Sequence, residues 1–227
     1  MSDDLAARVA ALEGEVGRLA DVDAIRKLQH AYGYFMDKCM FAEIVDLFAD
    51  DCELRFMGGV FHGKAGARRL YGGGSGLNGP VDGMLFEHLV VQDIVDVAPD
   101  RSLAWGRFRT FMQGGVHHSK QDAPPNIPPQ FLEGGVYENT YVREQGVWKF
   151  KVFDYTVVWQ ADFSEGWAST ADTSLMVSQY PELYPANPRG PDAHGAPPRR
   201  WPKAVVVPFH YRHPVTGQPI PTPDVRS

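Results

Sequence analysis

The stretch from Asp21 to Asp51 constrains the fold most, because it holds two apolar patterns with helical spacing in direct succession. The two sets of apolar residues are Ile25, Leu28, Tyr32, Phe35 and Met36, followed by Phe41, Ile44, Val45, Leu47 and Phe48. This pattern predicts two helices joined by a short bend around Asp37.

Asp37 stands among apolar neighbours at this bend. Its carboxylate is expected to point into partly apolar surroundings, where its ionisation and hydrogen bonding have large consequences. The alternative is an aspartate that ends a helix and faces solvent. The pattern alone leaves both interpretations open.

Long stretches of alternating character follow the helices and predict strands. The expected strands are Cys52 to Phe61, Met84 to Val97, Leu103 to Gln113, Glu133 to Arg143 and Val147 to Trp159, with a short helix from Ala65 to Tyr71. A helical layer followed by a meandering antiparallel sheet is typical of an α+β fold. Nothing in the 227 residues suggests a second core.

The segments before and after this α+β unit have different sequence patterns. Residues 1–19 carry a heptad-like stripe, which predicts a helix that packs on its own domain or on a neighbouring subunit. Residues 20–165 form the predicted α+β domain, and residues 166–227 form a proline-rich arm that is too apolar to be disordered. A short helix is possible at 171–178. The arm is expected to pack on the domain or on a neighbouring subunit.

Two loops without periodicity interrupt the predicted elements. The loop from Gly114 to Gln130 is long enough to be a lid or a binding loop. The glycine-rich loop from Gly72 to Gly83 lacks the ending of a phosphate-binding loop. We therefore interpret it as a flexible connection.

Composition excludes several classes of function. The net charge is −6, and no basic run interleaved with aromatic residues occurs, so a nucleic-acid-binding surface is not expected. Two cysteines are too few for a disulfide framework or a zinc site. His210 and His213 lack a matching set of metal ligands. The N-terminal segment resembles neither a signal peptide nor a membrane anchor, and a reducing cytoplasm is the expected location.

Four segments together resemble the SnoaL-like branch of the nuclear transport factor 2 superfamily. They are AIRKLQHAYGYFMDKCMFAEIVDLFADD, then Phe86-Glu87-His88, then LAWGRFRTF, then GVYENTYVREQGVWKF. The resemblance covers roughly Leu19 to Phe163. It implies a cone in which a curved sheet wraps the N-terminal helices and encloses one deep, largely apolar cavity.

The first segment is similar to bile-acid 7α-dehydratases, and this similarity implies that Tyr32, Asp37 and His88 act together. The final GVWKF also resembles scytalone dehydratases. Neither dehydratase needs a metal or an organic cofactor. Ideal helix geometry instead favours Tyr34 on the face of Asp37. The further aspartate and arginine of the bile-acid enzymes fall at about Met112 and Val157, which disfavours a steroid substrate.

Several other residues are candidate substrate contacts. Tyr137 and Asn139 share the face of their strand that should point inward, and Phe56 and Phe108 are expected to line the cavity. Arg109 lies on the opposite face by alternation, so it reaches the cavity only if a bulge turns it inward. Without a bulge, Arg107 and Arg109 are a surface or subunit-interface pair.

The sequence therefore predicts a lyase that works without a cofactor on a hydroxylated aromatic compound. The aromatic-rich strands and the proline-bearing loop also resemble the lyases that convert lignin-derived diaryl compounds into stilbenes and release formaldehyde. The alternatives are a dehydratase of a steroid or polyketide-type alcohol, a ketosteroid-type isomerase and a non-catalytic binding protein. A homo-oligomer, either a trimer or a dimer, is expected. No nucleic-acid or membrane partner is expected.

Overall fold

The computed structural model describes residues 2–72, 79–123, 127–170, 180–196 and 199–225. The two predicted helices are present as α1 (Ser2–Asp37) and α2 (Phe41–Asp46). The apolar stripe from Leu5 to Leu19 and the first central helix form one continuous α1. α1 ends after Asp37 because Cys39 takes a left-handed φ of 51°, which turns the chain toward α2.

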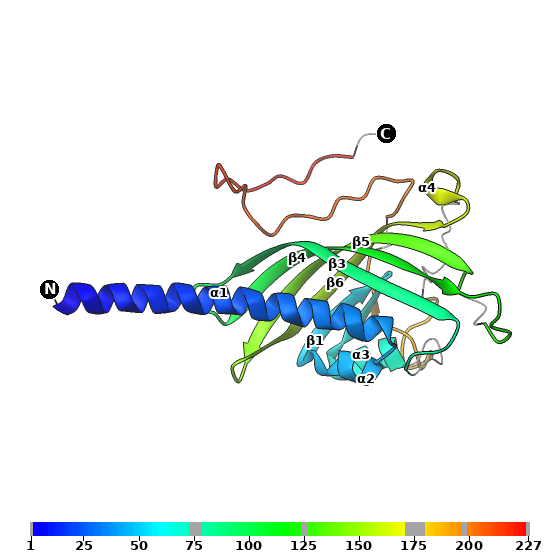
Figure 1. Cartoon of the computed structure of the whole chain (residues 1–227), viewed down its shortest axis with the longest axis horizontal. Helices are drawn as coiled ribbons and strands as arrows, with labels where there is room; N and C mark the ends of the chain where they lie inside the picture. Colours follow the sequence, from blue (N-terminus) through cyan, green and yellow to red (C-terminus); the bar gives the residue numbers. More distant parts are fainter. Residues whose placement is uncertain (1, 73–78, 124–126, 171–179, 197–198, 226–227) are drawn as a thin grey trace.

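A seven-stranded sheet follows the helices, in the order β3-β4-β5-β6-β1-β2-β7. Its strands are β1 (Phe48–Phe56), β2 (Gly59–His62), β3 (Met84–Val97), β4 (Leu103–Val116), β5 (Gln130–Glu144), β6 (Val147–Asp162) and β7 (Ala193–His194). The remaining helices are α3 (Gly63–Gly72) and α4 (Gly166–Ser169). The predicted α+β class is confirmed. The sheet is curved but open (Figure 1). By the strand order, β3 and β7 are its edges.

Two details of the sheet correct the sequence prediction. The expected strand from Cys52 to Phe61 is a hairpin, because Met57 and Gly58 both take positive φ and turn β1 back into β2. The sheet is not wholly antiparallel, because β1 pairs with β6 in parallel. Alternation within a segment could not reveal this pairing, which joins strands far apart in the chain. The possible helix at 171–178 lies outside the described residues.

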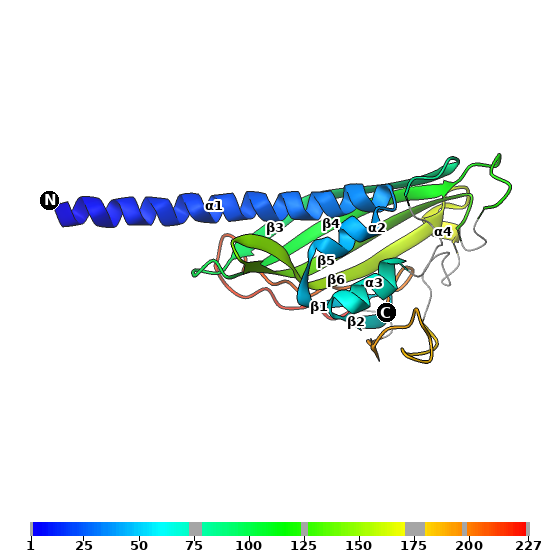
Figure 2. The ribbon, with the colours of Figure 1, turned by 90° about the horizontal axis from the view of Figure 1, so that it is seen from below.

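The sheet separates the helices from the C-terminal arm. α1, α2 and α3 cover one face, and residues 201–225 extend across the other (Figures 1 and 2). The core lies under the helices and is rich in aromatic side chains. Its largest fully buried members include Tyr137, Tyr141, Phe48, Phe61, Phe108 and Phe150.

The arm is attached to the sheet by specific contacts. The backbone N–H of Trp201 donates to the carbonyl of Val158 at 2.8 Å. The Arg107 guanidinium lies 4.4 Å from the centre of the Phe209 ring and donates to the carbonyl of Val207 at 2.9 Å. These contacts place residues 201–209 on the face away from the helices.

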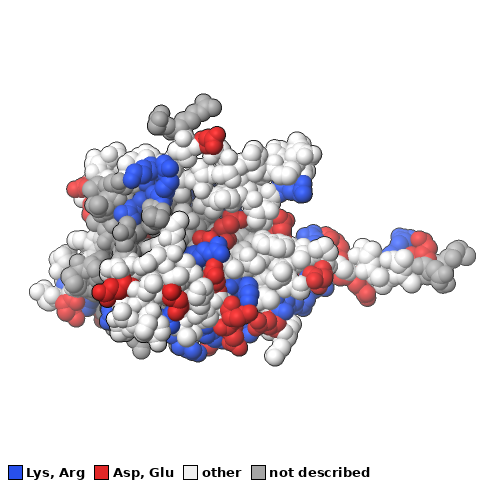
Figure 3. All heavy atoms as spheres, turned by 180° about the vertical axis from the view of Figure 1, so that it is seen from behind, with Lys and Arg blue, Asp and Glu red and all other residues white. Residues whose placement is uncertain are grey.

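The N-terminal half of α1 extends beyond the sheet. Its apolar side chains Leu5, Val9, Leu12, Val16 and Leu19 are all exposed, by 45% to 65%. Figure 3 shows this part as a rod in which uncharged residues lie between acidic and basic ones. No helix in the described part of the chain is long and apolar enough to cross a membrane.

Candidate active site

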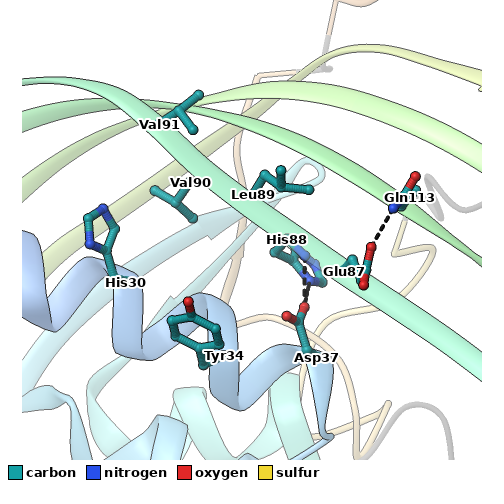
Figure 4. Close-up of a pocket in the computed structure, with 9 residues that line it drawn as sticks. All are labelled: His30, Tyr34, Asp37, Glu87, His88, Leu89, Val90, Val91 and Gln113. Atoms are coloured by element: carbon teal, nitrogen blue, oxygen red, sulfur yellow. Dashed lines mark hydrogen bonds and ion pairs between the residues drawn. The ribbon is translucent and has the colours of Figure 1, made fainter.

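A groove of about 500 Å³ lies between the C-terminal half of α1 and the edge strand β3. Its walls are formed by His30, Tyr34, Asp37, Glu87, His88, Leu89, Val90, Val91 and Gln113. Figure 4 shows that His30, Tyr34 and Asp37 come from the helix, and that His88 and Val90 of β3 face them. The groove is large enough for a small organic molecule and is open to solvent on one side.

Asp37 and His88 make direct contact in this groove. One carboxylate oxygen of Asp37, Oδ1, lies 2.8 Å from Nδ1 of the His88 ring and also accepts the backbone N–H of His88 at 2.8 Å. Their side chains are only 13% and 9% exposed. Because the Asp37 carboxylate accepts a hydrogen bond from Nδ1–H, a neutral His88 ring has its free lone pair on Nε2. The ring is therefore fixed and oriented for proton transfer at Nε2.

Gly33 allows the helix to approach the strand closely enough for this contact. A Cβ at Gly33 would lie 3.2 Å from the backbone oxygen of His88 and 3.3 Å from a methyl carbon of Val90. Asp37 follows four residues later on the same side of α1. A glycine at this position thus brings the last turn of α1 within hydrogen-bonding distance of β3.

Of the two candidate tyrosines, Tyr34 lines the groove and Tyr32 does not. Tyr34 is three residues before Asp37 on the same helix face, and it is 74% exposed. Tyr32 is buried in the aromatic core, where its hydroxyl lies 3.3 Å from that of Tyr71. Burial raises the pKa of the Tyr32 phenol, so Tyr32 stays neutral. The structure therefore places Tyr32 away from the groove surface.

The other predicted substrate contacts also lie outside the groove. Phe108 is a core residue, and its ring packs edge-to-face with the His30 ring, with 6.4 Å between ring centres. Tyr137 stacks on Tyr155 in the core, with 4.5 Å between ring centres. Phe56 also stacks on Tyr155, and it lines a separate cavity beside the C-terminal arm.

Asn139 and Arg109 have structural partners. Asn139 is buried, donates to Gln29 at 2.9 Å and accepts the backbone N–H of Asp154 at 2.9 Å. Arg109 is exposed on the face away from the helices and donates to Gln92 at 3.1 Å. The irregularity in β3 lies beyond Val91, opposite Arg109, but it does not turn Arg109 toward the helices. Arg109 therefore lies on the outer face, as strand alternation predicted, and not where a substrate contact would need it.

Sequence reasoning did not single out His30, which lines the groove, or the buried polar residues Glu133 and Thr110. His30 precedes Tyr34 by four residues and Asp37 by seven, so helical spacing could have identified it. Glu133 and Thr110 are buried, and the hydroxyl of Thr110 has no hydrogen-bond partner among the described residues. Alternation back from Tyr137 through Gly135 places Glu133 on the inward face, which was the available signal.

These buried groups form a layer between two apolar clusters. The interior polar layer consists of His88, Thr110, Glu133 and Gln160. On one side of it lies the aromatic core, and on the other lies a smaller cluster containing Val116, Ile127 and Phe131, whose fourth member, Met112, stands within the layer between His88 and Glu133. Within the described residues, no group of three or more histidine, cysteine or acidic side chains could hold a metal ion.

Comparisons with known proteins give one family and several similar structures. A family model described as a SnoaL-like domain matches residues 17–154. A protein from Novosphingobium aromaticivorans, provisionally named a scytalone dehydratase, is 22% identical, with a TM-score of 0.51 over 64% of this chain and 89% of that chain. The type 3 hexachlorocyclohexane dehydrochlorinase LinA from Novosphingobium barchaimii is 21% identical, with a TM-score of 0.52 over 66% and 94%. At these identities the likeness shows a common fold. No curated protein matches the chain.

Proposed function

Because the chain belongs to the SnoaL-like domain family, we propose that it is a lyase that uses the Asp37–His88 pair, without a cofactor, to eliminate a small molecule from a hydroxylated aromatic substrate. The observation that carries the proposal is the 2.8 Å contact between His88 Nδ1 and Asp37 Oδ1 at the wall of a groove. The names of two structural neighbours, a dehydratase and a dehydrochlorinase, support the reaction class.

The chemistry requires one group that takes a proton and later returns it. In the proposed reaction, Nε2 of His88 takes a proton from the substrate, and the resulting imidazolium is stabilised by Asp37. The ring then gives that proton to the departing hydroxyl, which leaves as water. The carbon–oxygen bond breaks, and a new double bond forms from the electrons that the lost proton leaves behind.

A para-hydroxylated diaryl substrate extends this scheme to formaldehyde release. Loss of the phenolic proton and of a benzylic hydroxyl gives water and a quinone methide. His88 then takes the proton of a neighbouring hydroxymethyl group, and the carbon–carbon bond breaks to release formaldehyde. The bonding electrons restore the aromatic ring, and the phenolate receives the proton from His88. The products are a stilbene, water and formaldehyde, and the protein supplies positioning and proton transfer.

The groove supports an aromatic ligand in particular. Tyr34 offers a ring face on the helix side, and Val90, which shares the helix-facing side of β3 with His88, offers an apolar surface on the strand side. Aromatic side chains provide large, oriented contact surfaces for planar ligands. The largely buried Asp37–His88 pair lies at one end of this surface, so a ring lying along the groove would present its substituents to His88.

The test is to incubate the protein with a panel of hydroxylated diaryl compounds and steroid alcohols while following ultraviolet absorbance and assaying formaldehyde. A new conjugated chromophore establishes a lyase, and formaldehyde beside it selects carbon–carbon cleavage over simple dehydration. A product that differs from the substrate but has the same mass would identify an isomerase instead.

Variants of the pair separate catalysis from binding. His88→Ala is expected to lower turnover by roughly 10² or more with the fold intact. Asp37→Asn should also lower turnover, since it removes the carboxylate that orients the ring. Tyr32→Phe, a change in the core, is the matched control and should retain turnover. If ligands bind but no product forms, and Asp37→Asn leaves affinity unchanged, the protein is a binding protein.

A further inference from the structure

Glu133 is a buried carboxylate on the same face of the sheet as His88. The strand register places His88 opposite Met112, and Met112 opposite Glu133. Residues directly opposite one another in antiparallel strands share a face, so all three side chains point toward the helices. Two strand spacings separate the backbones of His88 and Glu133 by roughly 10 Å. Glu133 itself is only 4% exposed.

The direct hydrogen-bond partners of Glu133 are neutral. The hydroxyl of Tyr155 donates to Oε1, and the amide of Gln160 donates to Oε2 at 2.9 Å. Burial raises the pKa of Glu133 above its usual range, and the hydrogen bond from Tyr155 and the positive charge of a protonated His88 oppose this shift without cancelling it. Two neutral donors can hold a carboxylate in place, but neither balances its charge.

The groups that surround Glu133 and His88 show which side chain can balance the negative charge of Glu133. Tyr155 and Tyr137 lie close to Glu133 and are themselves kept neutral by burial, which raises the pKa of each phenol. Tyr32 of α1 contacts the Tyr137 ring and is neutral for the same reason. His88 is faced by the other groove groups His30, Tyr34, Asp37 and Glu87. In the row of the sheet formed by His88, Met112 and Glu133, His88 is the side chain that can carry a positive charge.

We propose that Glu133 is a positioning residue for His88, and that its carboxylate stabilises the protonated imidazole from the interior of the sheet while Asp37 holds the ring from the helix. This assignment deepens the proposed lyase function, because the imidazolium is the form that carries the proton between its uptake and its delivery. His88 then has two carboxylates with different tasks. Asp37 sets the orientation of the ring, and Glu133 adds charge stabilisation in a place that water does not screen.

The proposal requires that the two groups titrate as a coupled pair. An ionised Glu133 favours the protonated His88 ring, and a protonated His88 ring favours ionised Glu133. The coupling is reciprocal, so removing either charge must displace the titration of the other by the same amount.

The ring-nitrogen nuclear magnetic resonance signals of His88, followed against pH, test this coupling. In Glu133→Gln, the midpoint of the His88 signals should move to lower pH by roughly one unit, as expected for unit charges at this separation inside a protein. Gln keeps the shape of Glu and can still accept from Tyr155. The matched control is Glu87→Gln on β3, where solvent screens the charge, and its displacement should be clearly smaller.

A reciprocal measurement tests the same coupling in a second variant, so the proposal can be tested even if Glu133→Gln does not fold. In His88→Gln, the carboxyl-carbon signal of Glu133 should show a higher pKa than in the wild type. An unchanged midpoint in either experiment, or an equal displacement in Glu87→Gln, overturns the proposal. Both titrations use the free protein, so they stand even if no lyase activity is found. An active lyase with uncoupled titrations would refute the role of Glu133 alone.

Discussion

Asp21 fixes α1 to the sheet at the point where the helix leaves the body of the molecule. Its carboxylate accepts hydrogen bonds from Arg101 and from the Trp148 indole, the latter at 3.0 Å, and lies 3.5 Å from Arg143. Burial alone would raise the pKa of Asp21, but these hydrogen bonds and positive charges together lower it. The loop between β3 and β4 and the strands β5 and β6 thus each contribute one side chain that contacts Asp21.

Replacing Asp21 by Asn should lower the free energy of unfolding, and the loss should be largest near neutral pH. Because the pKa of Asp21 is lower in the folded state, its contribution is fully present above the unfolded value of about 3.9 and is lost as pH falls through the folded value. We expect Asp21→Asn to cost about 2 kcal/mol at pH 7, and the cost to shrink on acidification. Denaturant unfolding at several pH values measures it. Asp23→Asn, an exposed neighbour, is the control, and an equal loss there would contradict the assignment.

At the scale of the element, α1 has two parts with different partners. The part after Asp21 packs on β3, whereas the part before it exposes an apolar stripe to solvent. An isolated helix of this length is only marginally stable in water, so the stripe needs a partner to be maintained. A second copy of the chain offers the same stripe for heptad-like pairing.

Deleting residues 1–19 should therefore reduce the mass of the particle in solution. Light scattering of the full chain and of the shortened chain measures this change. Leu12→Glu, a single charge in the middle of the stripe, should give the same reduction without shortening the helix. An unchanged mass in both variants would show that the stripe does not join subunits.

The close approach of α1 to β3 makes a second prediction at this scale. Alanine favours a helix over glycine by up to about 1 kcal/mol, so Gly14→Ala, where the side chain meets nothing, should stabilise the protein slightly. Gly33→Ala should lack this gain, because its methyl group presses on His88 and Val90. It should also weaken the Asp37–His88 contact and lower turnover. Thermal unfolding of the two variants, with turnover of the second, measures both effects. Equal stabilisation would contradict the close contact.

The sequence predicted the elements better than it predicted their partners. Apolar spacing placed the bend at Asp37 and the bounds of β3, because both depend on neighbours in the chain. Resemblance paired Asp37 with His88, which are 51 positions apart. Phe108 and Tyr137 were assigned to the substrate because alternation identifies an inward face but cannot tell a filled core from a cavity wall. The partners of Asn139 and Glu133 come from other elements, so no local pattern could reveal them.

For the whole molecule, the C-terminal arm covers the face of the sheet that the helices leave open. Arg107 is the centre of this attachment, because it pairs with Glu138 on β5 while contacting Phe209 and Val207 of the arm. His210 pairs with Glu138 as well. Arg109, two residues along the same strand and face, contacts Gln92 instead.

Arg107→Ala should release the arm, whereas Arg109→Ala should not. The first change removes an ion pair, a ring contact and a hydrogen bond to the arm, and we expect it to cost about 2 kcal/mol of stability. Hydrogen exchange of residues 201–211 is the direct readout, and protection there should fall only in Arg107→Ala. Equal protection in the two variants would show that other contacts hold the arm.

The parallel pairing of β1 with β6 has a consequence for how the chain reaches this structure. Arg55 on β1 and Asp154 on β6 lie 99 positions apart, yet they are joined side by side. During synthesis the chain emerges from its N-terminus, so β1 can pair with β2 early but remains without its parallel neighbour β6 until almost the whole domain has been made. Pairings between distant segments also slow folding, because a large loop must close first. The groove between α1 and β3 can form early, whereas the sheet beneath it is completed last.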